Sequence, residues 1–196
     1  MALDYFGQQT SNSDDNTGTQ QQLSFFWGKS FACPGSGSRT VEELSALCWK
    51  MTGATIPKIR GGIWTTAGVL VGESDEVSVA GTASPGTWQG GMSAAAIRPK
   101  GGSLGDAVTI TGGTSYLLGV AETNLGALGM RYQSGGSSGD VEYQVQVDYS
   151  AGLPDIQYSR WTDWSGWWNV RCGLTQQTTD LNIHASECVG SNSIFG

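Results

Sequence analysis

The chain has 196 residues and a net charge of −7, a size that fits one domain with a sizeable hydrophobic core. It holds 10 Lys and Arg against 17 Asp and Glu, with no basic cluster, which argues against binding to nucleic acid or to an anionic membrane surface. No apolar run reaches the ~18 residues of a transmembrane helix. The 30 glycines, with only 5 prolines, favour many tight turns.

The opening residues, M-A-L-D-Y-F-G-Q-Q-T, have neither the basic nor the apolar region of a signal peptide. We therefore expect synthesis in a cytoplasm and, if the protein reaches the outside, another route of export. Residues 1–20 are polar and predict an N-terminal arm. Residues 21–174 are expected to form the β-sandwich domain, and residues 175–196 a polar C-terminal tail.

Apolar and polar residues alternate along much of the chain, and this period of two predicts β-strands. The clearest case is residues 141–149, V-E-Y-Q-V-Q-V-D-Y, whose apolar side chains share one face of a strand. One dry and one wet face favour an antiparallel sheet, so we predict an all-β sandwich or barrel with little helix. Other strands are expected at residues 22–28, 56–64, 69–72, 88–98, 108–110, 114–122 and 127–133.

Two stretches depart from simple alternation. In residues 114–122 both parities are apolar, which predicts a strand that is covered on both faces. In residues 40–51, Thr40 and Glu43 match a helix capping box, and the apolar residues that follow fit a helical face. The local pattern of this second stretch therefore predicts a helix.

The four cysteines are Cys33, Cys48, Cys172 and Cys188, and their spacing contains no zinc motif. We expect no metal and no cofactor. The sequence-local disulfides Cys33–Cys48 and Cys172–Cys188 are one interpretation, and four buried thiols are the other. A set containing Cys48–Cys172 would suit a sandwich whose first and last strands are neighbours.

A longer pattern runs through I-R-G-G-I-W-T-T-A-G, a later T-W, V-T-I-T-G-G-T-S-Y-L-L-G-V-A and V-D-Y-S-A-G-L-P. It resembles the jelly-roll β-sandwich modules of bacteriophage virion proteins and some bacterial surface proteins, over roughly residues 20–175. Gly62, Ile63 and Trp64 match a hairpin-opening strand, Trp88 a buried Trp, and residues 110–118 a second strand. The resemblance implies that residues 41–50 form a strand, against the local pattern, and we adopt the strand. It carries no catalytic residues to this chain.

An aromatic cluster near the C-terminus is the main candidate binding surface, because exposed Trp rings stack on sugars or on partner proteins. The alternative is that half of these rings close the end of the sandwich. The cluster comprises Tyr158, Arg160, Trp161, Asp163, Trp164, Trp167 and Trp168.

Other candidates have plainer interpretations. Ser103 lies in a G-x-S-x-G sequence upstream of His184, the order of a serine hydrolase, but no helix is expected after the motif. His184 is expected to be a solvated tail residue. The segment of Asp14, Asp15 and Asn16 could supply calcium ligands but is more typical of a turn. The acidic run of Glu73, Asp75 and Glu76 is expected to be a solvated loop.

Function is therefore predicted mainly from the resemblance. We expect a non-enzymatic structural and adhesion module of a bacteriophage particle, such as a capsid decoration, tail or fibre component. It would bind viral structural proteins or copies of itself, and Ile194 and Phe195 at the polar terminus would form an assembly arm. The alternatives are an extracellular carbohydrate-binding module that uses the Trp cluster and, remotely, a serine hydrolase.

Overall fold

The computed structural model describes residues 3–7, 15–20, 26–50, 55–80, 89–123, 128–134, 149, 151–156, 166–168 and 170–175. These residues are almost entirely β, as predicted, and their one helical element is the short 3-10 turn η1 (Ala94–Ala96). The strands are β1 (Leu3–Gly7), β2 (Asp15–Gln20), β3 (Phe26–Ala32), β4 (Ser38–Ala46), β5 (Cys48–Lys50), β6 (Lys58–Thr65), β7 (Leu70–Ser74), β8 (Val77–Ser78), β9 (Gln89–Ser93), β10 (Ile97–Pro99), β11 (Thr109–Thr111), β12 (Ser115–Glu122), β13 (Leu128–Ser134), β14 (Gly166–Trp168) and β15 (Val170–Thr175).

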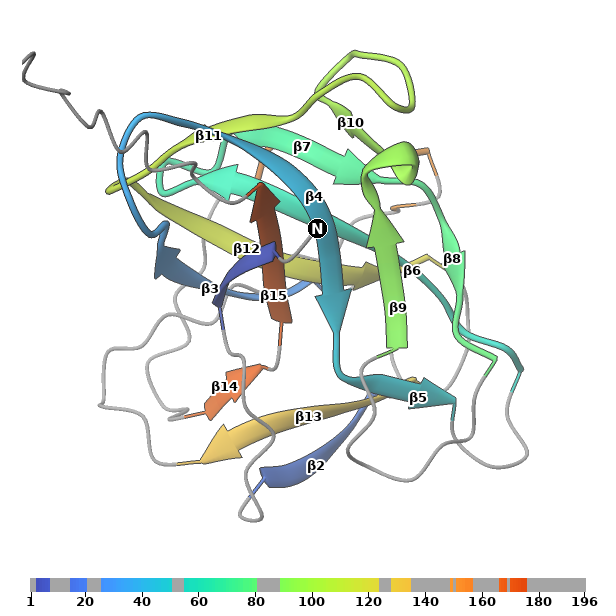
Figure 1. Cartoon of the computed structure of the whole chain (residues 1–196). Helices are drawn as coiled ribbons and strands as arrows, with labels where there is room; N and C mark the ends of the chain where they lie inside the picture. Colours follow the sequence, from blue (N-terminus) through green and yellow to red (C-terminus); the bar gives the residue numbers. More distant parts are fainter. Residues whose placement is uncertain are drawn as a thin grey trace, which may run out of the picture.

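The strands form three antiparallel sheets. Sheet 1 has the order β1-β15-β4-β11, with β9 also beside β4. Sheet 2 has the order β10-β7-β6-β12-β3, with β8 beside β6, and sheet 3 has the order β14-β13-β2, with β5 beside β13. In Figure 1 the strands of sheet 1 run across those of sheet 2, and sheet 3 lies at the lower end of this sandwich.

The main core lies between sheets 1 and 2. Alternate residues of each strand point inward, so Leu44 and Cys172 of sheet 1 pack in the same cluster as Ile63 and Leu118 of sheet 2. All four are almost fully buried. Each such side chain contributes roughly 1.5–3 kcal/mol of hydrophobic stabilisation before the entropy cost. This arrangement confirms the prediction of an antiparallel, sandwich-like all-β fold.

Sheet 2 is also covered on its outer face. Trp64 and Leu117 are directly paired across β6 and β12, point away from the main core, and are completely buried. Tyr149, Leu153 and Ile156 complete this second cluster from outside the sheet. The prediction that residues 114–122 are covered on both faces is therefore confirmed, and the covering segment includes residues 151–156.

Residues 38–50 are extended, so the local helical pattern of residues 40–51 is wrong and the strand implied by the resemblance is present. The reason is tertiary. In β4, Leu44 pairs with Cys172 of β15 on one side and with Met92 of β9 on the other. Two neighbouring strands and a buried inner face outweigh a helix preference of a few tenths of a kcal/mol per residue, ~0.5 at most.

The expected N-terminal arm is not separate from the sandwich in its described part. Residues 3–7 form β1, which pairs with β15 from Leu3↔Thr175 to Gly7↔Arg171 and buries Phe6 in the main core. Residues 15–20 form β2 of sheet 3. The alternation of apolar and polar residues did not predict β1, because Phe6 is the only residue of this strand that is fully buried. Residues 141–148 and the tail beyond residue 175 lie outside the described residues.

Cys33, Cys48 and Cys172 are free, buried thiols. Neither the predicted Cys33–Cys48 bridge nor the Cys48–Cys172 bridge is present, and Cys172 is unbridged, so the buried-thiol interpretation holds for these three; Cys188 lies outside the described residues. Burial raises the pKa of the Cys48 thiol to about 12. Such a thiol behaves as a small apolar core residue and is a poor nucleophile at neutral pH.

Candidate functional site

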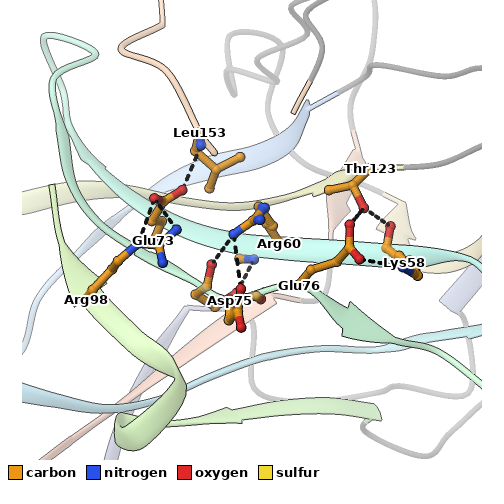
Figure 2. Close-up of polar contacts among 10 residues, drawn as sticks. Lys58, Arg60, Glu73, Asp75, Glu76, Arg98, Thr123 and Leu153 are labelled. Atoms are coloured by element: carbon orange, nitrogen blue, oxygen red, sulfur yellow. Dashed lines mark hydrogen bonds and ion pairs between the residues drawn. The ribbon is translucent and has the colours of Figure 1, made fainter. Parts of the chain in front are cut away.

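A group of paired charged side chains lies along β6 and β7 (Figure 2). At its centre is Glu73, which was expected in a solvated loop but is 8% exposed inside β7. Its Oε1 accepts hydrogen bonds from Nε and Nη2 of Arg98 at 3.0 and 2.9 Å, and its Oε2 accepts one from the backbone N–H of Leu153 at 2.7 Å. Both carboxylate oxygens therefore accept hydrogen bonds. We call these contacts of Glu73 with Arg98 and Leu153 the Glu73 latch.

We define residues 151–156 as the strap. Glu73 binds the strap through the N–H of Leu153. The Trp64 indole N–H donates to Pro154 O at 2.8 Å, and the Ile156 N–H donates to Gly68 O at 2.9 Å. Gly68 has φ +84°, and a Cβ there would overlap the Ile156 carbonyl oxygen, so the close approach requires glycine. These bonds fix the strap against the outer face of sheet 2.

Asp155 ties the other side of the strap. Its Oδ1 accepts the Leu70 N–H at 2.7 Å, and its Oδ2 pairs with Lys100. The hydrogen bonds from Lys100 and from the Leu70 backbone hold the pKa of the Asp155 carboxyl below its usual value. The strap is thus held by two carboxylates, one buried and one exposed.

The remaining acidic residues of the run at 73–76 are also paired. Arg60 donates to Ser74 O at 3.2 Å and lies 3.5 Å from Asp75 Oδ1. Glu76 accepts from Lys58 and from Thr123, each at 2.7 Å, and these bonds, Lys58 first, lower its pKa. Figure 2 shows these pairs as a row beside the Glu73 latch. The run therefore cross-links strands, and the prediction of a solvated loop is wrong for Glu73.

A second polar network lies on the outer face of sheet 1. The Tyr5 hydroxyl donates to Glu43 Oε2 at 3.1 Å, and the Arg171 guanidinium lies 4.3 Å from the centre of the Tyr5 ring. Arg171 Nε donates to Ser45 Oγ at 3.0 Å. Desolvation first, and the Glu43 charge second, raise the pKa of Tyr5. The network ties the edge strand β1 to its neighbour β15 and, across β15, to β4.

The predicted aromatic surface is described only in part. Tyr158, Arg160, Trp161, Asp163 and Trp164 lie outside the described residues, as do Ile194 and Phe195 of the predicted arm. Trp167 and Trp168 lie in β14 and pair with Gln133 and Tyr132 of β13.

Sheet 3 carries an aromatic residue that the sequence did not single out. Trp49 of β5 pairs with Gly129 of β13 and is half-buried. Its indole lies against the glycine backbone, because a Cβ at Gly129 would be 2.5 Å from both Cζ2 and Nε1. The signal that could have found it is an aromatic residue paired with a glycine, but the two residues are far apart in sequence.

The G-x-S-x-G sequence forms a turn between β10 and β11. Gly101 and Gly105 have φ values of +73° and +85°, and the Ser103 N–H donates to Asp106 Oδ2 at 2.8 Å. A strand follows this turn, as expected, so the strand–turn–helix geometry of a nucleophile elbow is not formed here. His184 and Asp14 lie outside the described residues, while Asp15 and Asn16 lie in β2.

No family model and no curated protein matches the chain. Within the part of the chain that the structure describes, no helix is long and apolar enough to cross a membrane. In the same residues, no group of three or more His, Cys, Asp or Glu side chains is arranged to hold a metal ion. Inferences about the function of the chain therefore rest on the contacts that the structure shows.

Proposed function

We propose that the chain is a non-enzymatic structural and adhesion module of a bacteriophage particle. It acts through contacts with viral structural proteins or with copies of itself, after synthesis in the host cytoplasm. Capsid decoration, tail and fibre components are the kinds of protein that fit. The proposal extends the resemblance to jelly-roll virion modules.

The observation that carries the proposal is the extended conformation of residues 41–50, which the resemblance implied against the local pattern. The two motif strands also lie as neighbours, since Gly62 pairs with Gly119 and Ile63 with Leu118 across β6 and β12. The two motif strands and residues 41–50, which are far apart in sequence, thus belong to one packed unit. If the short sequence patterns matched the family by chance, their strands would have no reason to pack together.

The construction of the sandwich supports a mechanical role. Ion pairs join separate elements on several sides: Arg39 to Asp4, Arg98 to Glu73 and Lys100 to Asp155. Arg39 is 2% exposed and also donates to Thr175 O at 2.6 Å, so it fastens β1, β4 and β15 together. A module that transmits load between subunits benefits from such cross-links, because they restrain the sheet edges.

The test is the location of the chain during infection. Particles are purified on a density gradient from a phage-producing culture and probed with an antibody raised against the recombinant domain. The proposal expects the chain to sediment with the particles in a fixed ratio to the major capsid protein. A chain that stays in the soluble lysate with a cytosolic marker enzyme would contradict it.

A further inference from the structure

The edge strand β1 is held by side-chain contacts on both of its faces. On the outer face of sheet 1, Leu3 and Tyr5 lie against Gly173 of β15, because a Cβ at Gly173 would be 2.9 Å from Leu3 Cδ1 and from Tyr5 Cε1. The Tyr5 hydroxyl donates to Glu43, and the Arg171 guanidinium covers the Tyr5 ring. The outer face therefore has a defined place for each of these two β1 side chains.

The inner face of β1 is recognised as specifically. Phe6 is 4% exposed and belongs to the main core cluster. Asp4 Oδ2 accepts a hydrogen bond at 2.7 Å from Arg39, which is itself 2% exposed. The strand ends at Gly7, whose φ of +104° favours glycine and where a Cβ would overlap Val170 O. Each of residues 3–7 thus has a specific partner, and these partners form a groove, which we call the β1 groove, for the sequence L-D-Y-F-G.

The two arginines of the β1 groove are positioned by partners outside β1. Arg39 donates to Pro34 O at 3.1 Å and to Thr175 O at 2.6 Å. Arg171 donates to Ser45 Oγ at 3.0 Å. Because these hydrogen bonds do not involve β1, they hold both cations in place for any strand that enters the groove. A site that is organised in advance loses less free energy when a peptide binds.

The position of β1 in its sheet allows the strand to be exchanged. In the described part of the chain, β1 forms a ladder with β15 alone, so its departure would break no other strand pair there. Residues 8–14 connect β1 to β2, and an extended connection of seven residues spans at most about 25 Å. That length allows β1 to reach a second copy in direct contact with the first.

We propose that the β1 groove is a self-association site in which residues 3–7 of a second copy replace the chain's own β1. Peptides that add a strand to a sheet edge gain affinity from main-chain hydrogen bonds and specificity from side-chain contacts, and the β1 groove offers both. A second copy is the occupant that fits, because it carries the carboxylate for Arg39 and the glycine at the positive φ. The inference rests on the contacts between copies in the proposed function and specifies how they form.

The exchange depends on concentration, because the chain's own β1 competes for the groove. A strand joined by a short connection competes at an effective concentration on the order of 1 mM. Exchanged strands make the same groove contacts as the chain's own strand, so exchange becomes extensive only where copies are crowded to a comparable concentration. A growing assembly meets this condition, whereas a dilute solution of the chain does not.

The experiment asks whether residue 3 of one copy lies beside residue 175 of another. Two full-length variants with different tags, both also carrying Cys188→Ser, contain either Leu3→Cys or Thr175→Cys, two positions that pair across β1 and β15. They are mixed at about 10 µM to 1 mM, equilibrated, and treated with a short bismaleimide cross-linker. The matched control is Ser38→Cys mixed with Thr111→Cys, an exposed pair across β4 and β11 for which no exchange is proposed.

The proposal expects a covalent heterodimer of the Leu3→Cys and Thr175→Cys chains, in a yield that rises with concentration and exceeds that of the control pair. Adding Phe6→Ala to the Leu3→Cys chain should lower the yield about tenfold, because the exchanged strand loses its buried anchor. If that variant does not fold, Asp4→Asn, which removes the ion pair with Arg39, should lower the yield in the same direction.

A yield equal to that of the control pair at every concentration would overturn the proposal. So would a yield that both β1 variants leave unchanged, because the cross-link would then report another contact between copies. The outcome is independent of where the chain sediments during infection. A failed exchange would therefore leave the virion assignment standing, and a chain absent from particles would leave the exchange standing.

Discussion

Glu73 and Glu76 are three residues apart in one acidic run, yet the structure predicts very different costs for neutralising them. The Glu73 side chain is 10% exposed and its partner Arg98 is 23% exposed, whereas Glu76 and its partner Lys58 are 27% and 46% exposed. We therefore predict that Glu73→Gln is strongly destabilising and that Glu76→Gln is nearly silent. The comparison keeps side-chain size constant, so it isolates the charge and its burial.

The magnitude for Glu73→Gln follows from its three hydrogen bonds. The amide oxygen can replace one carboxylate oxygen, but the amide N–H₂ then faces an N–H donor, from either Arg98 or Leu153. A hydrogen bond to a charged group is worth roughly 1.5–3 kcal/mol, and breaking a fully buried ion pair costs about 3–5 kcal/mol. Because Arg98 is partly solvated, we expect about 2–3 kcal/mol, or a fall in melting temperature of roughly 5–10 °C.

Urea denaturation followed by circular dichroism measures both variants. Glu76→Gln should cost under about 1 kcal/mol, the usual value for an exposed pair. A double-mutant cycle with Arg98→Met should show a coupling energy of about 1–2 kcal/mol at Glu73. Equal destabilisation by the two Gln variants, or no coupling to Arg98, would refute the view that Glu73 latches the strap to sheet 2.

Three further predictions concern the strap and the core. Gly68→Ala should lower stability by at least about 2 kcal/mol in urea denaturation, because the new Cβ would overlap the Ile156 carbonyl oxygen at a positive φ; a loss below about 1 kcal/mol would contradict the close approach. The Cys48 thiol, with its pKa raised by burial to about 12, should react with a thiol reagent only after unfolding, as a time course in increasing urea would show, and rapid reaction of the native chain would count against its burial. The pKa of Asp155 is held below its usual 3.8 by Lys100, so its contribution to stability is complete above the unfolded pKa and is lost as pH falls through the lower folded pKa. Asp155→Asn should flatten the acid side of a plot of melting temperature against pH, and an unchanged slope would show that the pair does not stabilise the fold.

The fold class could be predicted because alternation is a local signal. In residues 114–122 both parities are apolar, and this alone predicts the doubly covered strand that Leu117 and Leu118 demonstrate. The conformation of residues 40–51 could not be predicted in this way. Its apolar spacing fits a helix locally, and only the pairing of Leu44 with strands on both sides makes it extended.

The polar contacts could not be predicted because their partners are distant in sequence. The partners of Glu73 are 25 and 80 residues away, so its neighbours in sequence indicate only an acidic loop. The acidic run itself carries no sign of Arg98, the residue that pairs with Glu73. Composition showed only that acidic residues exceed basic ones.

Two aromatic residues lie over cross-strand glycines, so the same structural device occurs twice in the sandwich. A glycine in a strand leaves a gap in the side-chain layer, and an aromatic ring from the next strand fills it. Over Gly173 the Tyr5 ring is then closed from above by Arg171 and tied by its hydroxyl to Glu43, so every polar group is used within the sheet. Over Gly129 the Trp49 ring is half-buried. Tyr5 is half-buried as well, so both rings fill the gap above a glycine and keep part of their surface in contact with solvent. Trp49 and Gly129 are far apart in sequence, as are Tyr5 and Gly173, so neither ring-on-glycine contact could be predicted from local alternation.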